Sequence, residues 1–112
     1  TGPAPFYKEL GKKFGPIDLG FGNLGAYNFY PIIPVKDKST AHANPEELLS
    51  LMKDLKVKKV IGMHWGTAIL SLEPIWEPPV RFKENAEKFG YKKEEAIIFK
   101  IGEIKKLEDL IN

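Results

Sequence analysis

The spacing of apolar residues changes along the chain, and each spacing predicts a different element. Near the start, apolar side chains recur at every fourth position, as Phe6, Leu10 and Phe14. A period close to that of a helix favours a helix, and Gly15 and Pro16 directly after it are typical of a helix end. The pattern therefore predicts a short helix near the start of the chain.

The strongest helix signal is the stretch NPEELLSLMKDLK, which begins at Asn44. Asn44 suits the N-cap and Pro45 the first helical position, while Glu47 stands where the carboxylate of a capping box belongs. The apolar residues of this stretch share one helical face, and we expect them to pack in the core. They are Leu48, Leu51, Met52 and Leu55.

Apolar runs without a helical period predict strands. These runs are residues 17–21, 57–63 and 95–101, with a short return strand at 104–107 after a turn. Another helix is expected from Pro78 to Phe89, with Gly90 ending it and a single helical turn closing the chain. Because strands and helices alternate, the sequence predicts an α/β fold in layers.

Residues 22–43 form a long irregular connection rich in glycine, proline and aromatic residues. A connection of this length in a compact domain is usually a functional loop or a lid. We therefore expect part of a functional site there.

Composition narrows the possible functions. The 112 residues suffice for one domain, and 43% of them are hydrophobic, enough for a core. Seventeen basic against fifteen acidic side chains leave a net charge of +2, too small for a nucleic-acid footprint. The chain has no cysteine, which excludes disulfides and thiolate metal sites and fits a cytoplasmic protein. No apolar run is long enough to predict a transmembrane helix.

The two histidines are the candidates for chemistry. His64 follows the strand expected at 57–63, and ligands of open α/β sheets bind beyond the carboxyl ends of strands. His42 stands just before the helix that begins after Asn44, where it could donate a proton or contact an anion. On position alone, a histidine such as His64 is more often a hydrogen-bonded structural residue, and the alternative for His42 is a surface loop residue. A catalytic zinc ion needs three protein ligands, so these residues alone do not make a complete site.

Four short motifs occur in one order: LGAY at 24–27, HANPEEL at 42–48, GMHWGT at 62–67 and EPPVRF at 77–82. Together they resemble the C-terminal half of the metallo-β-lactamase-fold hydrolases. Within that fold they are most similar to the N-acylphosphatidylethanolamine-hydrolysing phospholipase D group and its bacterial relatives.

The resemblance implies the C-terminal half of a four-layer αββα sandwich, with one mixed sheet and helices on its outer face. It implies two zinc ions between the sheet edges, most of whose ligands come from an HxHxDH motif that residues 1–112 lack. The opening Thr1-Gly2 matches the end of a GDTG turn, so the bridging aspartate would directly precede Thr1. We therefore expect residues 1–112 to be a single incomplete domain.

The resemblance also assigns roles to individual residues. His64 matches the last metal ligand, and His42 matches the histidine near the substrate phosphate or leaving group, which implies a catalytic role. Tyr27 of LGAY and Trp65 of HWGT are the candidates for substrate binding.

The implied function is zinc-dependent hydrolysis of a phosphodiester, as in a phospholipase D-like enzyme, with this chain inactive on its own. The alternatives are a metal-dependent lactonase or nuclease of the same fold, or a non-catalytic remnant that assembles with a partner. The expected partner is the N-terminal half of the fold or a second copy in a homo-oligomer. Several strand residues are candidates for the face that such a partner would cover: Ile17, Leu19, Phe21, Val57, Ile61, Ile97 and Phe99.

Overall fold

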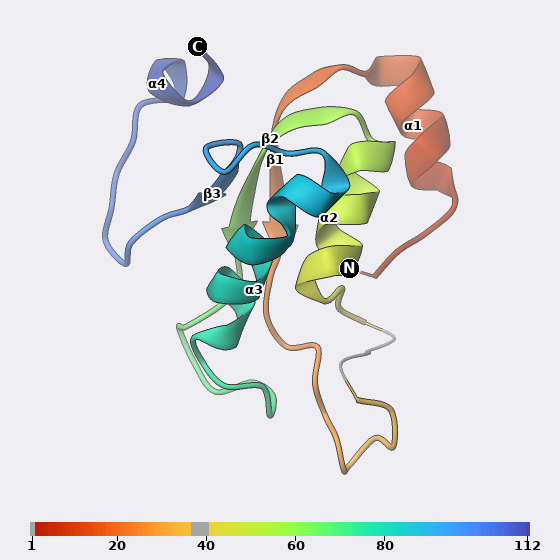
Figure 1. Ribbon diagram of the computed structural model, residues 1–112, viewed down its shortest axis with the longest axis vertical. Coiled ribbons are helices and arrows are strands. Elements are labelled where there is room, and N and C mark those ends of the chain that lie inside the picture. Colours follow the sequence, from red (N-terminus) through yellow and green to blue (C-terminus); the bar gives the residue numbers. More distant parts are fainter. Residues whose placement is uncertain (1, 37–40) are drawn as a thin grey trace.

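The computed structural model of the protein describes residues 2–36 and 41–112, and a three-stranded parallel sheet lies at its centre (Figure 1). Thr1, which the resemblance placed beside the bridging aspartate, lies outside the described residues. The strands lie in the order β1-β2-β3. The elements in chain order are α1 (Phe6–Phe14), β1 (Ile17–Asn23), α2 (Pro45–Asp54), β2 (Val57–Met63), α3 (Glu77–Asn85), the 3₁₀ helix η1 (Ala86–Phe89), β3 (Ala96–Ile98) and α4 (Leu107–Ile111). This alternation confirms the predicted α/β class.

The sheet differs from the expected one in two ways. Both described strand pairs are parallel, so the sheet is parallel and the expectation of a mixed sheet is wrong. The return strand expected at 104–107 does not form either, and β3 is shorter than the predicted strand. The Glu103 carboxylate accepts the Lys100 N–H at 2.8 Å and closes a turn, and Ile104 after it is 93% exposed. Among the described residues no strand pairs with 104–107, and its two apolar side chains, Ile104 and Leu107, are exposed, so burial does not favour a strand there.

Helix α2 forms as the sequence predicts. The Asn44 side chain accepts the Glu47 N–H at 2.8 Å, and the Glu47 carboxylate accepts the Asn44 N–H at 3.0 Å, which completes the capping box. Its apolar face lies on β1, where glycines leave room for it. A Cβ at Gly22 would lie 2.2 Å from a methyl carbon of Leu48, so the helix packs directly against the strand backbone.

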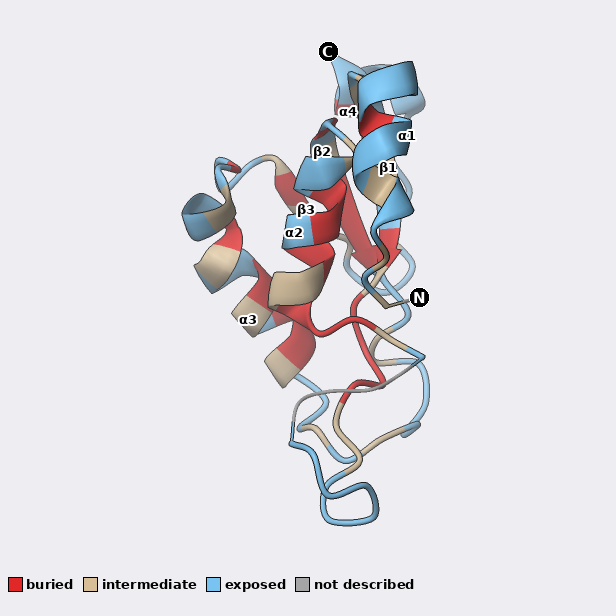
Figure 2. Cartoon of the chain, turned by 90° about the vertical axis from the view of Figure 1, so that its right-hand side faces the viewer, coloured by how far each residue is buried: buried red, intermediate tan, exposed pale blue. Residues whose placement is uncertain are grey.

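Helix α1 is confirmed as a helix, but its apolar stripe faces solvent. Phe6 is 54% exposed and Phe14 is 62% exposed, and α1 is mainly pale blue where α2 shows much red (Figure 2). The side of α1 that meets α2 is built around Gly11, where a Cβ would lie 2.0 Å from the Asp54 carbonyl oxygen. Hydrophobic spacing alone therefore identified the helix correctly, while a glycine decides which side of it is buried.

Helix α3 and η1 together cover the segment predicted as one helix. The last turn tightens into a 3₁₀ helix and ends at Gly90, whose φ of 75° is left-handed. Phe82 and Ala86 are fully buried between α3, α2 and β3, while Phe89 is half-buried. Next to them, the buried Tyr91 hydroxyl donates to the Val57 carbonyl at 3.0 Å. These contacts join the helix layer to the sheet.

Candidate functional site

The site lies where β1 and β2 end, at the same edge of the sheet. The Leu24 N–H donates to the Met63 carbonyl at 2.8 Å, so the two chains leave the sheet side by side. His64 is the first residue after β2, with a φ of 67°, and Gly66 follows with a φ of 71°. A left-handed conformation at a residue other than glycine is uncommon, and it turns the chain sharply away from the strand. His64 is thereby exposed at the edge.

The structure brings the two predicted histidines together. The rings of His42 and His64 stack with centroids 5.1 Å apart and an angle of 22° between their planes. The Asn23 side-chain amide, at the end of β1, lies 3.2 Å from His42 Nδ1. Burial lowers the pKa of His42, and the neighbouring His64 lowers it further. Three segments that are separate in the sequence therefore converge on one imidazole pair.

The described residues of the site supply too few donors to hold a metal ion by themselves. Within residues 2–36 and 41–112, no group of three or more His, Cys, Asp or Glu side chains is placed to hold one. Stacked imidazoles also do not direct two nitrogen atoms at a common point, unlike the tetrahedral arrangement of zinc ligands. The described residues therefore do not form a complete metal centre, although His64 has the exposure that one ligand needs.

A carboxylate that sequence reasoning missed joins the two loops of the site. Glu73 accepts the backbone N–H of Ala26 at 2.6 Å and that of Asn28 at 2.9 Å, and the Ser71 hydroxyl donates to it at 2.6 Å. Burial raises the pKa of Glu73, but these hydrogen bonds favour the carboxylate and bring its pKa below the ordinary glutamate value. Its amide partners are 45 and 47 residues away, so no local pattern could have identified them.

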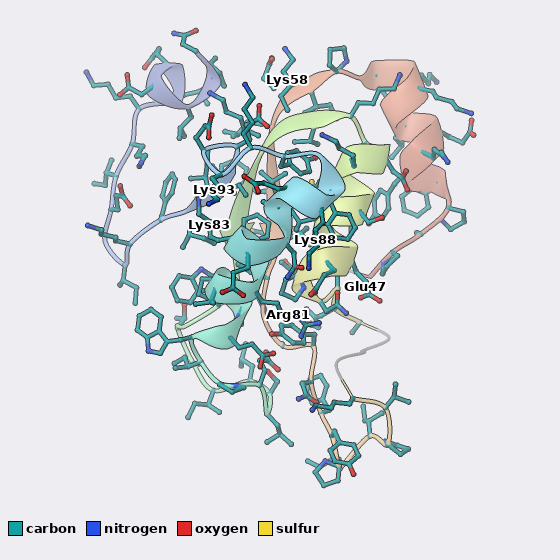
Figure 3. All side chains as sticks on the ribbon, in the orientation of Figure 1. Glu47, Lys58, Arg81, Lys83, Lys88 and Lys93 are labelled. Atoms are coloured by element: carbon teal, nitrogen blue, oxygen red, sulfur yellow. The ribbon has the colours of Figure 1, made fainter. Side chains whose placement is uncertain are left out.

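Tyr27, a predicted substrate contact, is fully buried in the structure. Its hydroxyl donates to the Glu77 carboxylate at 2.8 Å, and burial together with this carboxylate raises the pKa of Tyr27. Arg81, labelled on α3 in Figure 3, forms ion pairs with two carboxylates. These are Glu77 of the same helix at 3.3 Å and Glu46 of α2 at 2.9 Å. This network fixes the LGAY segment to both helices, and the substrate role of Tyr27 stays a prediction.

Trp65, the other predicted substrate contact, lies in the wall of a cavity of about 350 Å³ beside His64. Its ring packs against Trp76 with centroids 5.7 Å apart. The remaining lining is mostly aliphatic, and some of it is highly exposed, with Ile69 at 88%. The cavity therefore offers an apolar surface next to the histidine pair, and the substrate role of Trp65 stays a prediction.

No family model matches the chain. The N-acyl-phosphatidylethanolamine-hydrolyzing phospholipase D, mitochondrial, of Saccharomyces cerevisiae is 47% identical over 51 residues, which are 46% of this chain and 11% of that protein. The N-acyl-phosphatidylethanolamine-hydrolyzing phospholipase D 1 of Caenorhabditis elegans is 34% identical over 79 residues, 70% of this chain and 21% of that protein. An uncharacterized protein of Mycobacterium tuberculosis is 33% identical over 91 residues, 78% of this chain and 22% of that protein.

A solved structure is similar as well. Igni18, a novel metallo hydrolase from the hyperthermophilic archaeon Ignicoccus hospitalis, matches with a TM-score of 0.56 and 21% identity. The match covers 88% of this chain and 33% of that protein. At this identity the likeness concerns the fold alone. The chain thus spans about a tenth to a fifth of the length of the curated relatives named above and a third of the metallo hydrolase.

Proposed function

We propose that this chain, which is homologous over part of its length to N-acyl-phosphatidylethanolamine-hydrolyzing phospholipase D proteins and their bacterial relatives, supplies one half of a metal-dependent hydrolase site. In this proposal His64 is a metal ligand and His42 is the catalytic proton donor. The observation that carries it is the stacked pair of His42 and His64 at the carboxyl edge of a parallel sheet. Such an edge is where ligands bind in open α/β sheets.

The hydrogen bond from Asn23 prepares His42 for its role. An amide NH₂ donates and does not accept, so His42 Nδ1 is the acceptor and the proton of the neutral ring lies on Nε2. That proton can pass to the oxygen of a leaving group, which is general acid catalysis. Asn23 thereby sets the tautomer as well as the position of the ring.

His64 contributes one imidazole ligand, and the remaining ligands come from residues outside this chain, either a preceding half of the fold or another polypeptide. Zinc, when bound, supplies Lewis-acid chemistry and lowers the pKa of a coordinated water. This division of ligands explains why the described residues contain one exposed histidine at the right edge but no complete set.

The cavity beside His64 supports a lipid phosphodiester as the substrate class. Its aliphatic and tryptophan lining suits an acyl chain, with the phosphodiester directed toward the histidine pair. The first two relatives are named for hydrolysis of N-acyl-phosphatidylethanolamine, which has these two parts. A lactonase or nuclease of the same fold would use the histidine pair without needing the apolar cavity.

A second candidate function is non-catalytic assembly with a partner. It is favoured by one observation, the lack of a three-ligand group among the described residues. The two candidates predict opposite results for enzyme activity, so one experiment separates them.

The experiment measures turnover of N-acyl-phosphatidylethanolamine, whose alkoxide leaving group needs a proton, by the natural gene product that contains this chain. We expect His42→Ala to lower kcat by about two to four orders of magnitude, the usual contribution of a general acid. Lys88→Ala, on the exposed surface of η1 (Figure 3), is the control and should leave kcat unchanged. Equal turnover of His42→Ala and the unaltered protein would rule out the proposed role, and no turnover by the unaltered protein would favour assembly.

A further inference from the structure

Two loops leave the sheet edge and build the candidate site, and they contact each other both near the sheet and at their far ends. The first contains residues 24–28 and the second begins at His64 and reaches Glu73. Their backbones meet first at Gly25, where a Cβ would lie 2.5 Å from the His64 carbonyl oxygen. They meet again at the far end, where the Leu72 N–H donates to the Asn28 carbonyl at 2.8 Å.

We propose that Glu73 is a positioning residue of this site, because its carboxylate binds the N–H groups of Ala26 and Asn28 and thereby fixes the loop that starts at His64. The proposal rests on the proposed function of His64. Three donors converge on the carboxylate: the N–H groups of Ala26 and Asn28 and the Ser71 hydroxyl, at 2.6, 2.9 and 2.6 Å. Hydrogen bonds to a charged acceptor are shorter and stronger than neutral ones.

The Glu73 carboxylate stabilises an unusual backbone conformation at Ala26. Ala26 has a φ of 63°, a left-handed conformation that a residue with a Cβ rarely adopts. Such a conformation persists only when surrounding contacts impose it. The Glu73 carboxylate holds the N–H groups on both sides of Tyr27, so it imposes the turn from outside the loop.

The turn matters for the site because the same residues form the cavity. Gly25 and Ala26 line one wall, and the loop from His64 to Glu73 lines the other. Glu73 is the side chain that spans both walls. When it is lost, the close approach at Gly25 and the Leu72–Asn28 hydrogen bond remain, but the hydrogen bonds to the N–H groups of Ala26 and Asn28 are broken, and we expect the ring of His64 to shift from its place beside His42.

Glu73→Gln tests the proposal because it keeps the shape and removes the charge. A glutamine has one acceptor oxygen, and its NH₂ would face a backbone N–H that it cannot accept. Losing a hydrogen bond to a charged group should speed amide hydrogen exchange by about tenfold to a hundredfold. We therefore expect this acceleration at the amides of Ala26 and Asn28 in the full chain. Glu87→Gln, which removes an exposed carboxylate on η1, is the matched control and should leave exchange at both amides unchanged.

Local positioning must be distinguished from a general loss of stability. The amides of Leu48 and Val60 donate in the capped helix and the sheet, and their exchange should stay unchanged in Glu73→Gln. The NMR signals of the His64 ring should shift. Unchanged exchange at Ala26 and Asn28, equal acceleration at Val60, or unchanged His64 ring signals would each overturn the proposal.

These measurements involve no metal ion and no substrate. A failure of the proposed metal function would instead appear as unchanged metal content in His64→Ala. The two failures are therefore distinguishable.

Discussion

Single glycines decide how closely the elements of this chain approach one another. At Gly11 of α1, a Cβ would lie 2.0 Å from the Asp54 carbonyl oxygen and 2.8 Å from the carbonyl carbon of Leu55. Both neighbours are backbone atoms, which cannot move aside as a flexible side chain can. The orientation of α1 on the end of α2 therefore depends on the missing side chain.

The contact at Gly11 decides whether Gly11→Ala raises or lowers the free energy of unfolding. Helix propensity alone would make an alanine in a helix interior more favourable by about 1 kcal/mol. Overpacking against backbone costs about 1–3 kcal/mol, and at 2.0 Å we expect it to dominate, so the free energy of unfolding should fall. Urea denaturation measures it, with the exposed Lys12→Ala as the control on the same helix. A Gly11→Ala protein that is more stable than the unaltered one would show that α1 does not pack as described.

At the scale of elements, the sequence predicted what depends on local signals. The capping residues Asn44 and Glu47 and the stop at Gly90 were identified because each acts within one turn of its helix. The return strand at 104–107 was predicted wrongly because a strand needs a neighbour to pair with, and the part of the chain that the structure describes places none beside it. The expected roles of His42 and His64 came from the resemblance to a known family. Glu73 escaped notice because its partners lie far away in the sequence.

Two phenylalanines allow a buried helix position to be compared with an exposed one. Phe82 of α3 is fully buried, whereas Phe14 of α1 is 62% exposed. We expect Phe82→Ala to lower the free energy of unfolding by about 3–5 kcal/mol, the usual cost of truncating a buried phenylalanine. Phe14→Ala should change it by about 0.5 kcal/mol or less, as surface substitutions do. Urea denaturation of both variants checks this pair, and a comparable loss in Phe14→Ala would mean that the α1 stripe is covered in solution.

At the scale of the whole molecule, the chain is thin and leaves much of one sheet face uncovered. Its shortest dimension is 21 Å, room for two layers of secondary structure. Side chains alternate along β1, so Phe21 points away from the α2 face on which Gly22 lies, and it is 57% exposed. Met63 at the end of β2, the register partner of Asn23, is 45% exposed. Of the other residues predicted for this face, Val57 and Ile61 are buried, and Ile17, Leu19, Ile97 and Phe99 are half-buried.

This exposed apolar surface leads us to predict that the chain does not persist as a free monomer. Burying apolar area is worth roughly 25 cal/mol per Å², so covering Phe21, Met63 and the apolar stripe of α1 would add several kcal/mol. The occupant is either the remaining half of the fold or a second copy of this chain. Size-exclusion chromatography with light scattering gives the mass in solution. A well-folded particle of 12.7 kDa over a wide range of concentrations would exclude self-association.

The most direct test of the account is the metal content of the natural gene product that contains this chain, measured by inductively coupled plasma mass spectrometry. In the proposed site His64 binds the metal ion and its stacked neighbour His42 donates the proton. We therefore expect His64→Ala to lose bound metal, whereas His42→Ala should keep the full amount while its turnover falls. Full metal content in His64→Ala would contradict the proposed role of His64.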